Sequence, residues 1–190
     1  MQKKGKIFIL SGPSGSGKTT LYKKLLDNEE INKKITKTIS ITTRSKRLGE
    51  EHGKDYFFIS KKMFDYKIRA GHFLEWEKVF DNYYGTANKQ VKDILNKNKN
   101  VLLCIDVKGA KQVKKKHTDA IMVFIKTPNL DVLAKRLKER GSETDLTYSL
   151  RLKTAKEELK ESSNYQHIVV NDSLEVAYIK LKEIIFSHIN

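Results

Sequence analysis

"GPSGSGKTT", residues 12–20, follows the apolar run "KIFIL" at 6–10 and leads into "LYKKLLDN", which has the pattern of a helix. The stretch fits G-x-x-x-x-G-K-[ST], the phosphate-binding loop found between a strand and a helix. Its glycines leave backbone N–H groups open to a ligand where a Cβ would otherwise stand in the way. Because the helix adds the positive end of its dipole, the loop is predicted to hold a polyphosphate.

Individual residues of this loop have predicted roles. Lys18 is expected to reach the terminal phosphates of a nucleotide, and the Thr19 hydroxyl is expected to ligate the accompanying Mg²⁺. An ordinary turn rich in glycine and serine is the alternative, but the strand before it and the helix after it favour the phosphate loop. The residues expected to surround the phosphates are Gly12, Pro13, Ser14, Gly15, Ser16, Gly17, Lys18, Thr19 and Thr20.

Strand and helix patterns alternate along the rest of the chain. Nearly continuous apolar runs, typical of a parallel sheet covered by helices on both faces, lie at 6–10, 100–106, 120–126 and 167–171. The segment 37–87 is predicted to be a mixed insert, with short half-polar strands at 37–42, 55–60 and 73–80. Helices are expected at 18–27, 61–70, 88–98, 108–117, 129–140, 145–163 and 173–189. Together these patterns predict a single α/β domain.

Composition narrows the possible partners and compartment. The chain has 190 residues and one cysteine, Cys104, which fits a reducing compartment. Its start has a short apolar run that enters the glycine loop, so we expect a strand there and not a signal peptide. No apolar run approaches the ~20 residues of a membrane span, so we expect a cytoplasmic protein without a membrane partner. The net charge of +15 raises the question of nucleic acid, but the lysines are scattered and lack interleaved aromatic residues, so an anionic small substrate is expected instead.

Residues 40–56, "SITTRSKRLGEEHGKDY", resemble the guanylate kinases, whose GMP site has the pattern S-x-[ST]-T-R-x-x-R-x-G-E-x-x-G-x-[DEH]-Y. The resemblance continues in order through "FLEWEKVFDNYYGT", "IDVKGAKQV", "RLKERGSET", "RLKTAKEEL" and "VNDSLEVA". It implies a P-loop NTPase three-layer fold with a central parallel sheet, a small mixed α/β GMP-binding insert and a helical lid. The implied parts are a core at 1–36, 88–128 and 164–190, the insert at 37–87 and the lid at 129–163. The implied reaction is the Mg²⁺-dependent transfer of the γ-phosphoryl group of ATP to GMP, and also to dGMP, in purine nucleotide metabolism.

Two arginines and two tyrosines match the positions that hold the phosphate of GMP in this family. Arg44 and Arg47 supply planar guanidinium groups suited to a phosphate, and Tyr56 and Tyr84 add hydroxyl donors. Without the family resemblance, the two arginines would more often belong to a solvated basic loop. The resemblance assigns all four residues to the acceptor phosphate.

Glu75 is the expected reader of the base. A carboxylate only accepts hydrogen bonds, and guanine offers N1–H and N2–H₂ side by side, whereas adenine offers no matching pair. Alternation along "FLEWE" places Phe73, Glu75 and Glu77 on one face of a strand, and an exposed face is the alternative for Glu75. By resemblance, the hydroxyls of Ser40 and Thr86 would donate to guanine O6.

Asp106 ends an apolar strand, where its carboxylate would face the nucleotides at the carboxyl edge of the sheet. A simple helix N-cap is the alternative. The resemblance places this residue near GMP and Mg²⁺. Relatives commonly carry a second acid two residues earlier, where this chain has Cys104, so one negative charge is missing beside the guanine.

The predicted helices at 129–140 and 145–163 carry three arginines. Alone these would be read as a solvated helix face. By resemblance, Arg140 and Arg151 grip phosphates, Arg136 lies against the adenine, and Asn171 is another adenine contact. The implied catalytic set is Lys18, Arg44, Arg140 and Arg151, with no general base because the acceptor phosphate is already an anion.

Two other functions remain open from sequence. A kinase for dTMP or AMP would keep the glycine loop but not the set of Ser40, Glu75 and Thr86. A non-catalytic module related to guanylate kinases would bind phosphopeptides at the monophosphate site, but such modules lose the functional loop that is intact here. The sequence gives no indication of the oligomeric state.

Overall fold

The central sheet is built from five parallel strands, as the continuous apolar runs predict. The computed structural model describes residues 5–139 and 145–189 of the chain. In spatial order the strands are β2 (Ile35–Lys37), β7 (Asn100–Cys104), β1 (Ile7–Ser11), β8 (Ile121–Lys126) and β9 (His167–Val170). The middle strands are buried along nearly their whole length, which is why they carry no alternation of polar and apolar residues.

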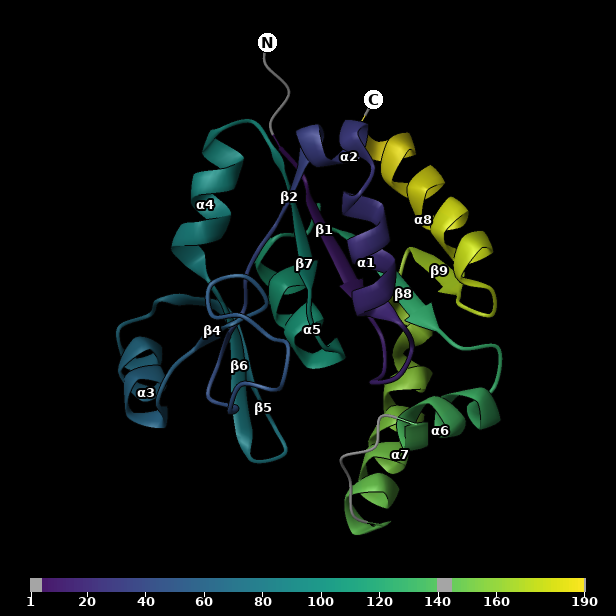
Figure 1. The fold of residues 1–190 in the computed structure, drawn as a ribbon. Helices are drawn as coiled ribbons and strands as arrows, with labels where there is room; N and C mark the ends of the chain where they lie inside the picture. The colour runs from purple at the N-terminus through teal and green to yellow at the C-terminus, as the bar shows by residue number, and fades with distance from the viewer. Residues whose placement is uncertain (1–4, 140–144, 190) are drawn as a thin grey trace.

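Helices cover both faces of this sheet and give the molecule three layers (Figure 1). Ile7 and Ile9 of β1 pack on one side, with α4 (Asn88–Asn96) and α5 (Val107–Lys116). Phe8 and Leu10 point to the other side, which is covered by α1 (Lys18–Leu26), α2 (Glu29–Lys34) and α8 (Leu174–Ile189). The predicted α/β three-layer fold is therefore confirmed.

A second, mixed sheet lies beside the first and has a small core of its own. Its order is β4 (Phe57–Phe58), β3 (Ile41–Thr42), β6 (Asn82–Ala87) and β5 (Phe73–Val79), and α3 (Lys61–Arg69) packs against it. Phe64 of α3 stacks on Phe73 of β5 with ring centroids 4.5 Å apart, and Ile41 completes the buried cluster. This sheet and α3 lie on one side of the lower half in Figure 1.

Two helices lie on the other side of the lower half in Figure 1, near the glycine loop. They are α6 (Leu130–Glu139) and α7 (Asp145–Lys160), and one 3-10 turn follows at Glu161–Asn164. They pack through Leu133, Leu137 and Ala155. No helix in the described ranges has the length and apolar character needed to cross a membrane.

The predicted strand at 37–42 is wrong, because this segment leaves one sheet and enters the other. Residues up to 37 pair with β7, and Thr38 still donates its N–H to the Leu102 carbonyl at 3.1 Å. The N–H of Ile39 then donates to a side chain, Gln90 Oε1, at 2.9 Å, and pairing resumes in the second sheet at Ile41. β-Branched residues suit a strand in either sheet, so the sequence does not indicate where the hydrogen-bond partners change.

Other elements also differ from the prediction, and the strands expected at 55–60 and 100–106 are shorter, Phe57–Phe58 and Asn100–Cys104. Helix α2 and strand β6 were not predicted, and the helix expected over 145–163 ends as an α-helix at Lys160. Helix α2 has six residues, fewer than two turns, so no amphipathic period can develop. Its N-terminus depends on Asn28, whose side chain accepts a hydrogen bond from the Ile31 N–H at 3.2 Å.

Candidate active site

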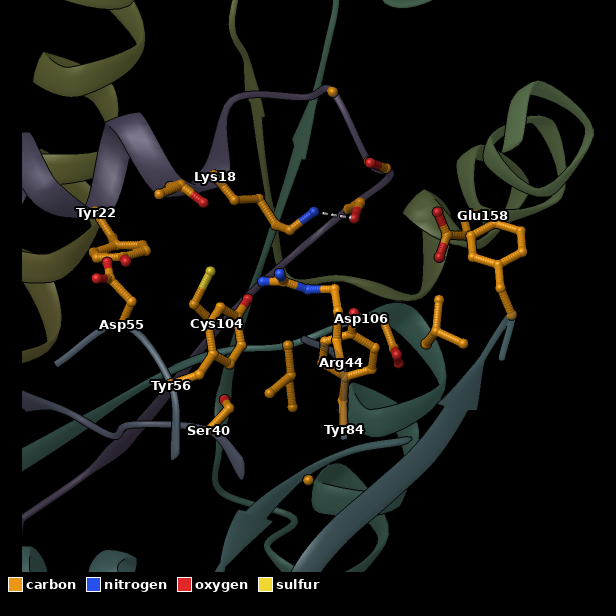
Figure 2. A pocket seen from close by; sticks show the side chains of 18 of the residues that line it. Lys18, Tyr22, Ser40, Arg44, Asp55, Tyr56, Tyr84, Cys104, Asp106 and Glu158 are labelled. Atoms are coloured by element: carbon orange, nitrogen blue, oxygen red, sulfur yellow. Dashed lines mark hydrogen bonds between the residues drawn. The ribbon is translucent and has the colours of Figure 1, made fainter. Parts of the chain in front are cut away.

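A cavity of about 410 Å³ opens between the glycine loop, the second sheet and helix α7. Figure 2 shows Lys18 on one side of it and Ser40, Tyr56 and Tyr84 on the opposite side. The predicted site residues that line it are Gly12, Ser14, Gly15, Gly17, Lys18, Thr19, Ser40, Arg44, Arg47, Tyr56, Glu75, Tyr84, Asp106 and Arg151. Residues separated by more than a hundred positions in the sequence thus face one space.

Six predicted residues do not line the cavity, and one cannot be placed. Pro13, Ser16, Thr20, Thr86, Arg136 and Asn171 are absent from its walls. Arg136 donates from Nη2 to the Asp172 carbonyl at 3.5 Å. Arg140 lies outside the described residues.

The glycine loop has a backbone that only glycine adopts easily. Gly12, Gly15 and Gly17 all have positive φ angles, and a Cβ on Gly12 would lie 2.1 Å from the Ile125 carbonyl oxygen. Gly17 leads directly into α1, so the loop ends at a helix N-terminus as predicted. Lys18 folds back over the loop, and its Nζ donates to the carbonyls of Gly12 at 2.6 Å and Pro13 at 3.0 Å.

Asn171 supports the glycine loop from outside the cavity. It is 4% exposed, and its Nδ2 donates to the Ser16 carbonyl at 2.9 Å. A Cβ on Gly17 would lie 2.1 Å from this Nδ2, so the amide fits against the loop only because residue 17 is glycine. Asn171 therefore fixes the loop backbone in this structure, and its contact with adenine stays a prediction.

Arg44 is held by a carboxylate that sequence reasoning left without a role. Its Nη2 donates to both oxygens of Glu50, at 2.7 and 3.0 Å, and its Nη1 donates to the Ser45 carbonyl at 2.7 Å. Burial disfavours the charged guanidinium and is the largest single effect, but the hydrogen bonds and charges of Glu50 and Tyr84 together outweigh it, so the pKa of Arg44 is raised. The signal was present in the sequence, because Glu50 occupies the acidic position of the matched pattern.

Two tyrosine rings stand beside Arg44. The guanidinium carbon lies 5.5 Å from the Tyr56 ring centroid, and the rings of Tyr56 and Tyr84 meet edge to face at 6.1 Å. Burial raises the pKa of Tyr56 to about 12, so its hydroxyl keeps its proton at neutral pH. The protonated Tyr56 hydroxyl can therefore donate a hydrogen bond to an anion.

Glu75 is buried, with 4% of its surface exposed, which excludes the exposed-strand alternative. Its Oε1 accepts a hydrogen bond from the Thr86 hydroxyl at 2.6 Å. Burial raises its pKa to about 7, and the nearby Asp106 carboxylate adds to the rise.

The predicted alternation along this strand is wrong because of a β-bulge. Phe73 pairs with Ala87, and Glu75 pairs with Thr86. Strand β5 therefore has one extra residue at this point relative to β6. Phe73 then belongs to the core of the second sheet, while Leu74 belongs to the core of the central sheet. The bulge connects the two cores and directs Glu75 inward.

Asp106 is the N-cap of α5, and its position in the cavity wall leaves the predicted role beside the nucleotides open. Its Oδ1 accepts the Gly109 N–H at 2.7 Å and so caps α5, yet the residue also lines the cavity. Burial raises its pKa. Cys104 lines the cavity as well, and burial raises the pKa of its thiol, so it adds no negative charge at neutral pH.

Glu158 is a cavity residue that sequence reasoning missed. It comes from α7, where Arg151, Thr154 and Glu158 all line the cavity, and Figure 2 shows it facing the same space as Asp106. Burial raises its pKa to about 7. The spacing of three and then four residues places these side chains on one helix face, which was a usable signal.

Comparisons with known proteins agree on one family. A family model described as guanylate kinase matches residues 4–188. A curated guanylate kinase of Campylobacter jejuni is 43% identical over 189 residues, covering 99% of this chain and 90% of its own length. One of Clostridium tetani is 42% identical, with coverage of 96% and 86%.

Two solved structures align with nearly the whole chain, one from the same family and one that shares only the fold. The guanylate kinase of Anaplasma phagocytophilum aligns with a TM-score of 0.81 at 28% identity, covering 99% of this chain and 88% of that one. A shikimate kinase from Bacteroides thetaiotaomicron aligns with a TM-score of 0.51 at 18% identity, covering 95% of this chain and 98% of that one, and shares the fold alone.

Proposed function

This chain belongs to the guanylate kinase family, and from that premise we propose how its residues divide between the two nucleotides. The enzyme transfers a phosphoryl group from ATP to GMP, giving ADP and GDP. The observation that carries the assignment of residues is the single cavity, which has a phosphate loop on one side and a cluster of arginine, tyrosine and glutamate on the other. Two anionic substrates can meet there.

The glycine loop is the proposed donor site. Its backbone N–H groups and the N-terminus of α1 would hold the phosphates of ATP. Lys18 now donates to the carbonyls of its own loop, and the terminal phosphates would replace these partners. Asn171 would fix the loop backbone by its hydrogen bond to the Ser16 carbonyl, a role that does not require contact with adenine.

Oxygen donors in the cavity suit Mg²⁺, which prefers oxygen ligands and retains several waters. We assign the Thr19 hydroxyl and the carboxylates of Asp106 and Glu158 to this ion and its waters. The described residues contain no group of three or more His, Cys, Asp and Glu side chains placed to hold a metal, so ATP phosphates and water would complete the coordination. Bound Mg²⁺ would neutralise charge on the transferred phosphoryl group.

Arg44, Arg47, Tyr56 and Tyr84 form the proposed acceptor-phosphate site. Glu50 holds one edge of the Arg44 guanidinium and so fixes its plane. Arg47 is exposed at the rim, where a bound phosphate would order it. Charge-assisted hydrogen bonds of this type are the strong ones in proteins, and together they would bind an otherwise strongly hydrated dianion.

Glu75 is the proposed guanine reader, and Thr86 acts through it. Because Thr86 gives its only hydroxyl proton to Glu75, it has none left for guanine O6, which leaves Ser40 as the O6 donor. The sequence suggested both Ser40 and Thr86 as donors to guanine O6, and this proposal keeps Ser40 alone. None of these contacts involves the ribose 2′-hydroxyl, so we propose that dGMP is accepted as well.

The chemistry proposed for these residues is positioning and charge neutralisation. Lys18 and Arg151 face the space where the phosphoryl group would pass, and no residue needs to remove a proton from the acceptor. We propose that the insert 37–87 and the lid 129–163 close over the substrates and exclude water, which would otherwise accept the phosphoryl group.

A coupled assay of ADP release tests this function directly. With ATP saturating, GMP and dGMP should be phosphorylated, while AMP, UMP and dTMP should react far more slowly. Comparable turnover of AMP or dTMP would contradict the assignment of the base site.

A further inference from the structure

Gly109 is a buried glycine in the first turn of α5, between two carboxylates of the cavity. Its N–H donates to Asp106 Oδ1 at 2.7 Å. A Cβ added to it would lie 2.6 Å from Glu75 Oε2 and 3.2 Å from Glu75 Cδ, well inside normal contact distance. The Glu75 carboxylate therefore occupies the space that a side chain at residue 109 would need.

The backbone does not explain this glycine. Residue 109 is not among the glycines with positive φ, and it lies inside a helix, where alanine is the more favourable residue. What glycine provides at this position is room. A methyl group would have to move either the helix turn or the carboxylate.

The helix turn is the firmer of the two. Asp106 caps it through the Gly109 N–H, the Ala110 N–H donates to the Asp106 carbonyl at 2.9 Å, and Val107 and Ala110 are buried in the core. The Glu75 carboxylate is at the end of a side chain and would yield first. Moving it would also disturb the 2.6 Å hydrogen bond from Thr86.

We infer that Gly109 is a positioning residue for guanine recognition: without a Cβ, it lets the Glu75 carboxylate lie against α5, in the place from which it reads the base. The inference rests on the proposed role of Glu75. The N-terminal turn of α5 also presents the positive end of a helix dipole to this carboxylate, which favours its ionised form.

The variant Gly109→Ala tests this. Its kcat/KM for GMP should fall by about ten- to a hundredfold, the loss expected when a binding group is displaced by about 1 Å. The loss should appear mainly in the KM for GMP. The KM for ATP and kcat/KM for AMP should stay near wild type, and any fall in the midpoint of thermal unfolding should disappear in the Glu75→Ala background, where no carboxylate is displaced.

A double-mutant cycle with Glu75→Ala separates positioning from a general packing effect. Without the Glu75 carboxylate there is nothing for the new methyl group to displace, so Gly109→Ala should cost nothing further in that background. An additive loss, or equal losses for GMP and ATP, would overturn the inference. So would normal GMP selectivity in Gly109→Ala.

The stability of the variants and the GMP/AMP selectivity of the single variants distinguish the remaining explanations. If Gly109→Ala unfolds but Glu75→Ala/Gly109→Ala folds, the clash is the cause and the inference stands; if both unfold, it falls. If Glu75→Ala itself leaves the GMP/AMP ratio unchanged, the proposed base reader is wrong and Gly109 loses its role with it. If Glu75→Ala lowers that ratio and Gly109→Ala does not, only the role of Gly109 is wrong.

Discussion

Burial of the Glu75 carboxylate in its charged form has a free-energy cost, which hydrogen-bond donors of a substrate would offset. Thr86 supplies one hydrogen bond to it, but burial still raises its pKa to about 7. Guanine would bring two N–H donors to this group, whereas adenine would leave it unsatisfied. Selectivity would then come from the unfavourable state of the free carboxylate as much as from the hydrogen bonds that guanine donates.

Glu75→Gln should lower the selectivity for GMP over AMP. The amide replaces one acceptor oxygen with a donor that must face a guanine N–H, which should cost roughly 2–4 kcal/mol, or about thirty- to a thousandfold in kcat/KM for GMP. AMP should lose far less. The control is Glu77→Gln, two residues along the same strand, where the side chain pairs with Lys108 outside the cavity. An unchanged GMP/AMP ratio in Glu75→Gln would refute the role.

The same carboxylate should make the nucleotide-free enzyme less stable as pH rises. Its pKa is raised from 4.5 to about 7, so the folded state binds this proton more tightly than the unfolded chain. The stability contributed in this way is fully present below about pH 4.5 and is lost as pH rises through about 7. Glu75→Gln should therefore lose less stability between pH 5 and pH 8 than wild type, by on the order of 2–3 kcal/mol in urea unfolding. Parallel pH dependences in the two proteins would contradict this, since Glu158 titrates in both and cancels.

Site residues were predictable from the sequence where their role depends on neighbouring residues in the chain. The glycine loop needs positive φ and open N–H groups in consecutive residues, so its pattern is visible in the sequence. Thr86 and Asn171 were predicted to contact substrates, and the structure shows contacts that the sequence did not indicate, with Glu75 and with the Ser16 carbonyl. Whether a side chain contacts a ligand or the residue that contacts it depends on the tertiary structure, and no spacing in the sequence records that.

At the level of elements, the loop from Arg44 to Glu50 acts as one unit. Glu50 accepts from the Arg44 guanidinium and also from the backbone N–H of Arg47 at 2.9 Å, so one carboxylate orders both arginine positions. Burial would raise the pKa of Glu50, but these hydrogen bonds lower it overall, so the group is ionised at neutral pH.

Glu50→Gln should weaken GMP binding without affecting ATP. The loss of a charge-assisted pair that orients Arg44 should raise the KM for GMP by about five- to thirtyfold, the equivalent of about 1–2 kcal/mol. Glu51→Gln is a matched control, because Glu51 pairs with Lys54 on the exposed surface. A KM for GMP that stays at the wild-type value would show that Arg44 needs no such support.

Element boundaries were least predictable where the two sheets meet. The break at Thr38 to Ser40 and the bulge after Phe73 both occur where the chain passes from one core to the other. β-Branched and aromatic residues suit a strand in either sheet, so local propensity predicts a strand and not its partners. The long apolar strands had no such ambiguity, because both of their faces are buried.

For the whole molecule, the parallel sheet brings the ends of three strands to one edge. The glycine loop follows β1, Cys104 ends β7 with Asp106 two residues later, and Lys37 ends β2, and all of them line the cavity. The second sheet and α7 supply the opposite walls. This arrangement follows from the parallel topology, in which carboxyl ends of adjacent strands open on the same side.

The central claim is that one cavity holds two separable nucleotide sites, and paired calorimetric titrations of two variants test it most directly. Lys18→Ala should lose several orders of magnitude in turnover yet bind GMP with near-wild-type affinity, because Lys18 is proposed to contact the donor phosphates. Arg44→Ala should bind ATP normally and lose about 1.5–3 kcal/mol of GMP affinity, the value of one charge-assisted hydrogen bond. If either variant weakened both nucleotides equally, or if Lys18→Ala kept normal turnover, the division of the cavity into donor and acceptor sites would be contradicted.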